Sequence, residues 1–475
     1  MTKSITSLFQ PATYPQLTET RSQLLSQMFV LGEQLLRDDP DYLEHYSHPS
    51  GRYDIGSIDL EKSHGPYLFT SKGKYFDATF SWMTDLLDPE KHKELRHPAY
   101  LELLGKLAQE DRTPTEDKMA IEAAFVELMK GFWTAAYKIL PVSAGGLATD
   151  DAMEAAIGQV ADKLNTKPQE LKGVAFDGAF HGRYGHGAEG TANIDKVGHK
   201  HTGRTDHVTA PILQYDKLGK IDEQKTKKTL RQSIKEVAEK LKDDKFAYVV
   251  CEFPIQAEGG ARIVNPKALS HLYELCQKYG KPLVVDCVQM GGRAWTINEN
   301  LISPFAQEVL EFADIITFGK IFHVNGTMLR DFTKLGRGFK SNWVDTHGPK
   351  ALGGTWTGHI SQMASGYAII QTVLQKKLYQ NAINKAQYIL SALQKMAKKY
   401  PVLTNVRGRS DTAYLAWSFA DSTTRDVFKK RMIENEHIIF LTAGDNSIRL
   451  APCADMTLKE VDSIIGAIDN QLRQM

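Results

Sequence analysis

The sequence predicts an α/β fold in which a larger domain is built on a mainly parallel sheet and a smaller α+β domain lies toward the C-terminus. Three observations support this prediction: short apolar runs rich in β-branched residues, helices of amphipathic spacing between them, and glycine-rich turns at the junctions. Strands that alternate with helices pair in parallel and are covered on both faces. Ligands of such proteins bind at the carboxyl ends of the strands.

Four apolar runs are the predicted strands: Val174–Gly178, Ala247–Pro254, Pro282–Val288 and Ala313–Lys320. Helices are predicted from Lys118 through the segment KMAIEAAFVELMKGFWTAAYKI, over Asp150–Leu164, and over Asn265–Gly280. The last of these begins with an Asn in N-cap position and ends with a Gly suited to a C-cap.

The C-terminal part predicts a long helical segment from about Ser361 to Tyr400, then short alternating segments and a terminal helix. The expected division is an N-terminal segment (1–80), a large cofactor-binding domain (81–360), and a connecting helix with a small C-terminal domain (361–475).

Composition excludes several classes of protein. The 475 residues contain 58 Lys+Arg and 57 Asp+Glu, so there is no basic excess of the kind that binds nucleic acid. The four cysteines are widely spaced without a CxxC pair, which indicates a reducing compartment. We find no signal peptide and no apolar run of membrane-spanning length, so a cytoplasmic protein without membrane contact is expected.

Charged and polar residues follow two of the predicted strands. Asp286 ends the run PLVVD, Gln289 comes three residues later, and Lys320 ends the run ITFGK. Taken singly, each residue fits an ordinary turn or loop. Together they suit pyridoxal phosphate, whose aldehyde needs an amine and whose ring nitrogen needs an anion to stay protonated. Lys320 would then serve as general acid and base.

Other segments supply the remaining parts of such a site. The loop Ser143–Leu147 leads into a helix whose N-terminal amides suit a phosphate group. Phe180, with His181 beside it, is placed after a strand to stack on a planar ring. Arg183 and Arg449 are candidates for binding carboxylates.

The ordered segments AGG, FHGR, EFPIQAEGG, VVDCVQ, ITFGK, GGTW and IRLAP resemble those of the class III pyridoxal-phosphate aminotransferases. Within this family the chain is most similar to the L-lysine 6-aminotransferases, through IDLEKSHGPYL, AFHGRYG, VRGRS and LTAGDNSIRLAP. The resemblance implies fold type I, transfer of a terminal amino group from lysine or a similar diamino acid to 2-oxoglutarate, and products glutamate and a semialdehyde.

The resemblance also implies roles for individual residues. Lys320 would bind the cofactor covalently, Asp286 would hold its ring nitrogen, and Gln289 would reach its phenolic oxygen. Val288 would pack on the ring opposite Phe180. Gly145, Gly146 and Leu147 would contact the phosphate. Thr355, from a second subunit, would join them, which implies a homodimer with shared active sites.

For the substrates, the resemblance implies that Arg183 holds the α-carboxylate of lysine and that Arg449 binds the α-carboxylate of 2-oxoglutarate or glutamate. Glu258 matches the family's gate, which pairs with Arg449 while the diamino substrate is bound and swings aside for the dicarboxylate.

Departures from the family pattern keep alternatives open. Cys287 stands where the family usually has Glu, and IFHVNG after Lys320 brings His323 and Asn325 near the site. The phosphate loop can be matched to the family pattern in two registers. Gly146 is a phosphate contact in both, whereas Gly145 and Leu147 compete for the second contact. The scaffold also hosts ornithine, 4-aminobutyrate and acetylornithine transferases, decarboxylases and mutases. His199, His201 and His207 lack a recognised ligand spacing, so no metal is expected.

Overall fold

The computed structural model describes residues 30–32, 34–35, 37–39, 55–56, 58–59, 62–109, 116–198, 201–216, 219–298, 301–353 and 358–475. The chain separates into two units, Met1–Gly56 and Ser57–Met475. The elements described below all belong to the second unit.

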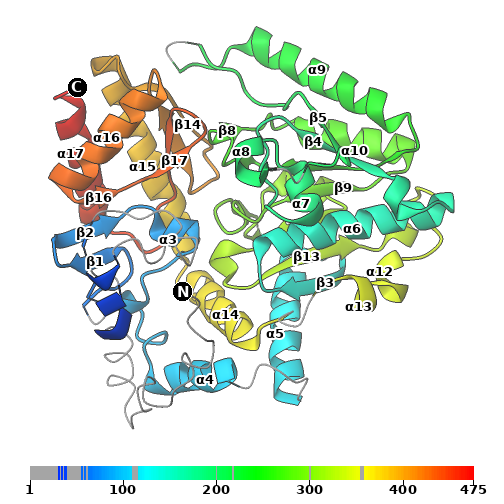
Figure 1. Ribbon diagram of the computed structural model, residues 1–475, viewed down its shortest axis with the longest axis horizontal. Helices are drawn as coiled ribbons and strands as arrows, with labels where there is room; N and C mark the ends of the chain where they lie inside the picture. Colours follow the sequence, from blue (N-terminus) through cyan, green and yellow to red (C-terminus); the bar gives the residue numbers. More distant parts are fainter. Residues whose placement is uncertain are drawn as a thin grey trace, which may run out of the picture. The chain divides into compact units, whose positions relative to one another are not determined.

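A seven-stranded sheet forms the centre of the large domain (Figure 1). Its order is β3 (Ala136–Val142), β13 (Asn325–Arg330), β12 (Ile315–Phe318), β9 (Leu283–Asp286), β6 (Phe246–Glu252), β4 (Lys172–Phe176) and β5 (Thr205–Val208). β13 runs antiparallel to both of its neighbours, and the other pairs are parallel. The predicted mainly parallel α/β fold is therefore confirmed.

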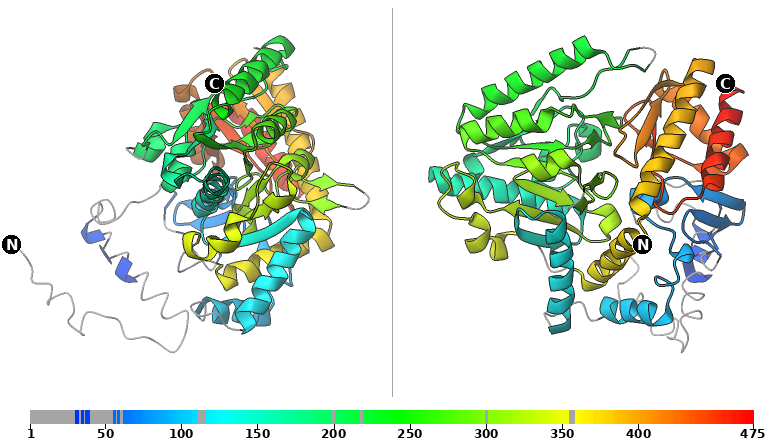
Figure 2. Two further views of the ribbon diagram at one scale, coloured as in Figure 1. Left: turned by 90° about the vertical axis from the view of Figure 1, so that its right-hand side faces the viewer. Right: turned by 180° about the vertical axis from the view of Figure 1, so that it is seen from behind.

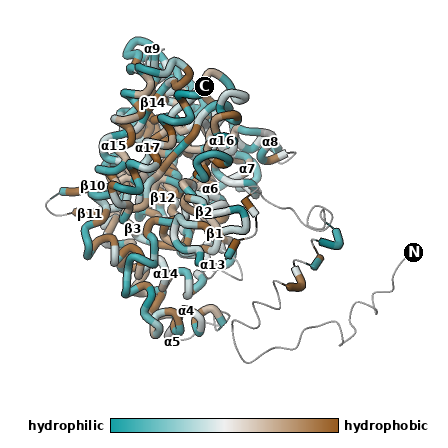
Figure 3. Tube along the Cα trace, turned by 90° about the vertical axis from the view of Figure 1, so that its left-hand side faces the viewer, coloured by the Kyte–Doolittle hydropathy of each residue, from teal (hydrophilic) through white to brown (hydrophobic). Residues whose placement is uncertain are grey.

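Both faces of this sheet are covered, as its continuous apolar strands require. In β9, Val284 packs in one core cluster with α6 (Gly145–Leu164), whereas its neighbours Leu283 and Val285 pack in another with α9 (Glu223–Leu241) and α10 (Ala268–Tyr279). α9 and α10 lie side by side (Figure 2). α9 is mostly hydrophilic (Figure 3), as expected for a surface helix. Only one stripe of this helix, which contains Val237 and Leu241, is buried.

The small domain has its own core. An antiparallel sheet of order β14 (Thr404–Gly408), β15 (Leu415–Ser418), β18 (Ser447–Leu450) and β17 (Leu441–Ala443) lies with α15 (Leu378–Lys399), α16 (Ser422–Glu436) and α17 (Leu458–Leu472). β1 (Tyr67–Thr70) and β2 (Gly73–Asp77) pair with β16 (Ile438–Ile439), so residues from both ends of the second unit share one sheet. Phe80 also belongs to the C-terminal core.

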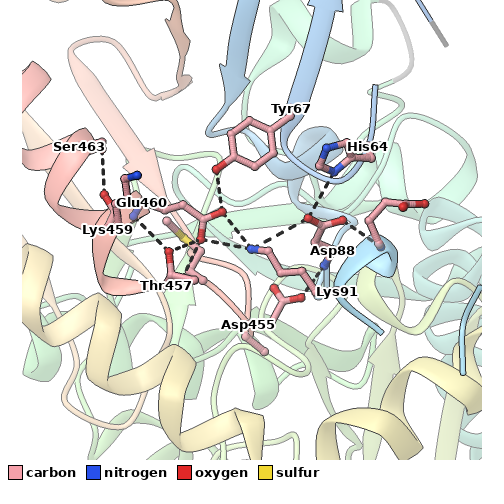
Figure 4. A network of polar contacts seen from close by, with 12 residues as sticks. His64, Tyr67, Asp88, Lys91, Asp455, Thr457, Lys459, Glu460 and Ser463 are labelled. Carbon is pink, nitrogen blue, oxygen red and sulfur yellow. Dashed lines mark hydrogen bonds and ion pairs between the residues drawn. The ribbon is translucent and has the colours of Figure 1, made fainter. Parts of the chain in front are cut away.

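A network of polar side chains joins these two ends (Figure 4). Glu460 of α17 accepts hydrogen bonds from Tyr67 at 2.8 Å and from Lys91 at 2.9 Å. The backbone N–H of Asp88 donates to the carboxylate of Asp455 at 2.9 Å. The domain boundary expected at residue 80 stays a prediction, but these contacts tie residues on either side of it to the C-terminal helix.

Four predicted helices differ from the observed ones: α6 begins at Gly145, before the predicted Asp150, and α10 begins at Ala268 with Lys267, not the predicted Asn265, in N-cap position. The other two differ more. The helix predicted through residues 118–139 ends earlier: α5 is Glu116–Phe132, and the residues that follow form β3. The apolar side chains of this run have helical spacing, but Ala136 and residues 138–142 pair with β13, with an irregularity at Tyr137. The long C-terminal helix is interrupted at Lys377, whose φ of 54° ends α14 (Ile360–Gln375) before α15 begins.

The remaining elements are short or lie around the sheet: α3 (Phe80–Met83), α4 (Pro98–Gln109), α7 (Gly185–Gly190), α8 (Ile194–Val197), α11 (Gln307–Phe312), α12 (Trp343–Thr346), α13 (Gly348–Ala351), and the hairpins of β7 (Ile255–Gln256) with β8 (Arg262–Ile263) and of β10 (Thr296–Ile297) with β11 (Ile302–Ser303). None of the helices in the described part of the chain is long and apolar enough to cross a membrane.

Candidate active site

Three neighbouring strands of the sheet bring polar side chains to one edge. In the register of the sheet, Glu252 at the end of β6 and Thr317 in β12 both lie opposite Asp286 at the end of β9. Lys320 follows β12 by two residues and begins a short 3-10 helix, Lys320–Phe322. The position of this edge agrees with the general placement of ligands in α/β proteins.

Asp286 is buried and held by three donors. His181 Nδ1 lies 2.8 Å from its Oδ2, while the Thr317 hydroxyl and the Val288 N–H donate to its Oδ1 at 2.9 and 3.0 Å. The side chain of His181 is completely buried, and its Nε2 has no hydrogen-bond partner among the described residues. A carboxylate so fixed can face a ligand with a defined orientation.

Lys320 occupies a left-handed backbone conformation, with a φ of 52°. Its ammonium nitrogen lies 3.2 Å from the carbonyl oxygen of Trp82. Burial lowers the pKa of Lys320 to about 8, and the positive charge of Arg449 acts in the same direction. The amine can therefore lose its proton near neutral pH, which a nucleophilic lysine requires.

Trp82 belongs to α3, where four consecutive residues from Phe80 to Met83 have positive φ angles between 49° and 66°. Such a left-handed turn costs roughly 1–2 kcal/mol per residue, so the surroundings must hold it in place. Asp77 does so through its carboxylate, which accepts hydrogen bonds from the N–H groups of Thr79 and Ser81. The strained turn presents the Trp82 carbonyl to Lys320.

The loop before α6 is a further part of the site, because Asn325 Nδ2 donates to its Ser143 carbonyl at 3.2 Å. α6 begins at Gly145 after Ala144, and in the part of the chain that the structure describes no side chain caps its N-terminus. The first N–H groups of a helix have no acceptor within the helix, so those of Gly145 and Gly146 are available to an anion. The N–H of Leu147, in contrast, donates to Ala144 at 3.1 Å. A Cβ on Gly145 would come within 2.7 Å of Val288 Cγ1, so this loop packs directly on Val288.

Phe180 comes after β4, and its backbone N–H donates to Glu252 at 3.1 Å. Ala257 donates to the other carboxylate oxygen of Glu252 at 3.1 Å. Burial raises the pKa of Glu252 to about 7. Its two backbone contacts hold the loop that carries Phe180 against the loop that leads to Glu258.

Glu258 lies at the centre of a second cluster of polar and charged side chains. Its Oε1 accepts from Arg449 Nη2, and its Oε2 lies 2.7 Å from Lys196 Nζ. Gln289 accepts from Arg449 Nη1 at 3.0 Å. Burial alone would raise the pKa of Glu258, but Arg449 and Lys196 together lower it to about 2. The ion pair is therefore charged at any physiological pH.

The structure thus brings together most of the predicted site residues: Lys320, Asp286, His181, Phe180, Val288, Gln289, Gly145, Gly146, Glu258 and Arg449. Arg183 lies in the exposed turn before α7, two residues after the buried His181. Leu147 is partly exposed on the first turn of α6. Thr355 lies outside the described residues.

Several residues of the site had not been predicted. Thr317 is the one polar side chain of β12, which was a usable signal in an apolar strand. Lys196 gave no signal, because it stands in the polar segment NIDKVGHK among residues typical of a surface loop. Trp82 contributes a carbonyl oxygen, which no side-chain pattern can indicate.

The histidines considered for a metal have other partners. His201 Nε2 lies 2.8 Å from the carbonyl oxygen of Thr191, and His207 Nε2 lies 3.2 Å from that of Gly190. His199 lies outside the described residues. Within the described ranges, no group of three His, Cys, Asp or Glu side chains is arranged to hold a metal ion.

Comparison with known proteins decides the family. The model of the family "Aminotransferase class-III" matches residues 58–472. The chain belongs to the class-III aminotransferases. An L-lysine-epsilon aminotransferase of Amycolatopsis lactamdurans is 25% identical over 436 residues, which are 88% of this chain and 91% of that protein.

A 4-aminobutyrate aminotransferase of Kluyveromyces lactis is 26% identical over 321 residues, or 66% of this chain and 64% of that protein. Among solved structures, the lysine aminotransferase of M. tuberculosis in its internal aldimine form has a TM-score of 0.77 at 22% identity, covering 92% of this chain and 99% of that one. The fold is therefore the type I fold of these enzymes.

Class-III aminotransferases depend on pyridoxal phosphate, and the chain is an enzyme of this kind. Its own residues fit the cofactor. The edge of the sheet offers a buried amine of lowered pKa, a fixed carboxylate on the adjacent strand, and an uncapped helix N-terminus for a phosphate. These three groups match the aldehyde, the ring nitrogen and the phosphate of the cofactor.

Proposed function

We propose that the chain transfers the terminal amino group of L-lysine, or of a similar diamino acid, to 2-oxoglutarate, giving glutamate and a semialdehyde. The observation that carries this proposal is the ion pair of Glu258 with Arg449 beside Lys320. An unmasked Arg449 would attract the α-carboxylate of a diamino acid and so bring the wrong end to the cofactor, whereas a dicarboxylate needs that cation. The relatedness to L-lysine-epsilon aminotransferases supports the same substrate class.

In this proposal Lys320 binds the cofactor and later moves the proton. Pyridoxal phosphate, when bound, supplies a protonated ring that accepts electrons from the reacting carbon. The lowered pKa of Lys320 lets its amine take and return a proton near neutral pH. Trp82 O, 3.2 Å from the amine, orients Lys320 before reaction.

Asp286 would keep the ring nitrogen protonated through its negative charge. His181 and Thr317 orient this carboxylate, and the burial of His181 excludes water from that side. Phe180 and Val288 would pack on the two faces of the ring, and Gln289 would reach its phenolic oxygen. The free N–H groups of Gly145 and Gly146 favour these residues over Leu147 as phosphate donors.

The substrates would be sorted by three residues. Arg183 would hold the α-carboxylate of lysine, which leaves the distal amine at the cofactor. Glu258 would neutralise Arg449 during this half-reaction and leave it when 2-oxoglutarate enters. Arg449 would then bind the dicarboxylate bidentately. Thr355 of a second subunit would complete the phosphate site, which makes the working enzyme a homodimer.

The test is a panel of amino donors with 2-oxoglutarate as acceptor, analysed by mass spectrometry. Lysine is expected to yield glutamate and a cyclic imine that reacts with 2-aminobenzaldehyde. Ornithine or 4-aminobutyrate as a far better donor would contradict the lysine assignment and leave the family unaffected.

Lys320 is tested separately. Reduction with borohydride should fix the cofactor to the peptide that contains Lys320, and Lys320→Ala should abolish both this adduct and the visible absorbance of the bound cofactor. A cofactor fixed to a different lysine would contradict its role.

A further inference from the structure

Lys196 is the second cation on the Glu258 carboxylate, and nothing in the reaction described above uses it. The two carboxylate oxygens of Glu258 are divided between two cations: Oε1 accepts from Arg449 and also from Gln289 Nε2 at 3.4 Å, and Oε2 lies 2.7 Å from Lys196 Nζ. Arg449 comes from β18 of the small domain, whereas Lys196 comes from α8 of the large domain. Glu258 can therefore leave one cation without leaving the other.

Lys196 is held in place by a second contact. Its ammonium group lies over the ring of Phe180, 5.1 Å from the ring centroid. An ammonium group over an aromatic face is attracted by the electrons of the ring. Lys196 thus stays beside the site without depending on Glu258 alone, and its side chain is 29% exposed.

The space around Glu258 shows where its side chain can move. A cavity of about 800 Å³ is lined by Glu258, Lys196 and Phe180, but not by Arg449. The carboxylate consequently stands between Arg449 and this cavity. A movement away from Arg449 leads toward a wall that already carries Lys196.

Other cations on the wall of this cavity are engaged elsewhere. Arg407 donates to backbone carbonyls of Ala261 and Asn405 and to the hydroxyls of Ser418 and Ser447. Arg262 donates to Gln256 and to the carbonyl of Asp177. Among the described residues of this wall, Lys196 is the cation that contacts Glu258.

Charge balance supplies the physical reason for a second cation. With the gate closed, one carboxylate is shared between two cations. With a dicarboxylate on Arg449, an isolated Glu258 would be a partly buried anion without a partner, which is costly. A remaining pair with Lys196 gives each cation its own carboxylate.

We propose that Lys196 is a positioning residue that holds Glu258 when the gate opens, and so determines how readily the enzyme accepts its dicarboxylate substrate. This proposal rests on the proposed function of Glu258 and Arg449. It predicts an asymmetry: loss of Lys196 hinders the half-reaction that needs an open gate and leaves the half-reaction with the amino donor largely intact.

The experiment compares Lys196→Met with wild type in two rapid-mixing assays that follow the absorbance of the cofactor, one with lysine and one with 2-oxoglutarate. We expect the second-order rate constant with 2-oxoglutarate to fall about tenfold, and that with lysine to change by less than about twofold. Lys196→Arg keeps the charge and should recover most of the loss.

A binding measurement without chemistry accompanies these assays. Glutarate has both carboxylates of 2-oxoglutarate but no keto group, and its affinity for the holoenzyme by calorimetry should also fall about tenfold in Lys196→Met. In a Glu258→Gln background there is no carboxylate to hold, so Lys196→Met should then change the affinity by less than about twofold.

Lys240 offers a matched control outside the site. It pairs with Asp206 at 2.5 Å and lies over the ring of Phe246, 5.4 Å from its centroid, so Lys240→Met removes the same kinds of contact. It should leave both half-reactions and glutarate binding unchanged.

Equal losses in the two half-reactions, or an unchanged affinity for glutarate in Lys196→Met, would overturn the role of Lys196. Failure of the proposed function looks different: the wild type itself would not transfer amino groups from lysine to 2-oxoglutarate. In that case the glutarate affinities of wild type and Lys196→Met still test the role of Lys196 independently. A wild type that does not bind glutarate would overturn both the role of Lys196 and the proposed function.

Discussion

Lys320 shows how the position of one residue in the fold sets its chemistry. An amine in water keeps its proton until well above neutral pH, but burial near Arg449 lowers the pKa of Lys320 to about 8 from 10.5. The unfolded chain therefore binds a proton more tightly at this residue than the folded chain does. At any pH at which Lys320 remains protonated, burying its charge therefore lowers the stability of the folded state.

A stability measurement on the cofactor-free protein tests this effect. Between pH 8 and 10.5 the unfolded chain holds a proton that the folded chain has lost, so the free energy of unfolding contributed by Lys320 rises with pH. Lys320→Met lacks this contribution. Urea unfolding should show that the stability advantage of Lys320→Met over wild type is largest below pH 8 and shrinks toward pH 10.5. A difference that is constant with pH would contradict the lowered pKa.

The residues at the strand ends could be predicted from the sequence, but only some of the side chains around them could. Asp286 and Lys320 each end a run of buried apolar residues, so sequence alone places them at one edge of a parallel sheet. Cys287 raised a question that the structure answers in part: its thiol is buried, 3.8 Å from the carbonyl of Phe253, and burial raises its pKa, so it is a neutral core residue. Lys196 could not be predicted, because its two partners are distant in sequence.

At the scale of elements, α14 fixes the turn that carries Lys320. Gly366 of α14 lies so close to this turn that a Cβ at its position would overlap the carbonyl oxygen of Phe322. Only a glycine permits this approach of two backbones. The helix and the 3-10 turn after β12 are therefore packed as one body.

Gly366→Ala should push α14 away from this turn and lower the free energy of unfolding by about 2–3 kcal/mol, as overpacking of a core does. Gly105 of α4 is a matched control, because a Cβ there meets nothing within 4 Å. Gly105→Ala should instead stabilise the protein by about 0.5–1 kcal/mol through helix propensity. Chemical denaturation of both variants measures the difference, and similar changes in both would show that the close approach is absent.

Elements were harder to predict where tertiary contacts outweigh local pattern. The helix predicted beyond Phe132 has the right apolar spacing, but residues 136–142 pair along β13 in the sheet. β13 itself was not predicted, since it runs antiparallel and follows Lys320 after only a short turn. Lys377 interrupts the long helix through its backbone conformation, and a lysine carries no sequence signal for that.

For the whole molecule, Glu460 links residues that are far apart in the chain. It caps α17 together with Thr457 and also receives hydrogen bonds from Tyr67 and Lys91. The side chain of Glu460 is only 9% exposed, so these bonds are poorly replaced by water.

Glu460→Ala removes the helix cap and both long-range bonds, and should lower the free energy of unfolding by about 2 kcal/mol. The control is Glu434 of α16, which forms an exposed pair with Lys430 at 3.7 Å and is 55% exposed. Glu434→Ala should cost no more than about 0.5 kcal/mol. Thermal or denaturant unfolding distinguishes the two, and equal effects would mean that the network in Figure 4 does not join the two ends.

The pairing of β2 with β16 has a consequence for how the protein is made. A ribosome releases β2 (Gly73–Asp77) long before its second partner strand at Ile438–Ile439. The strands of the central sheet all precede residue 331, so that sheet can assemble during synthesis. β1 and β2 can pair with each other at once, but the other edge of β2 stays unpaired until β16 emerges. Slow translation of the segment that leads to β16 would prolong this exposed state, and a product truncated before β16 would leave β2 as an open edge.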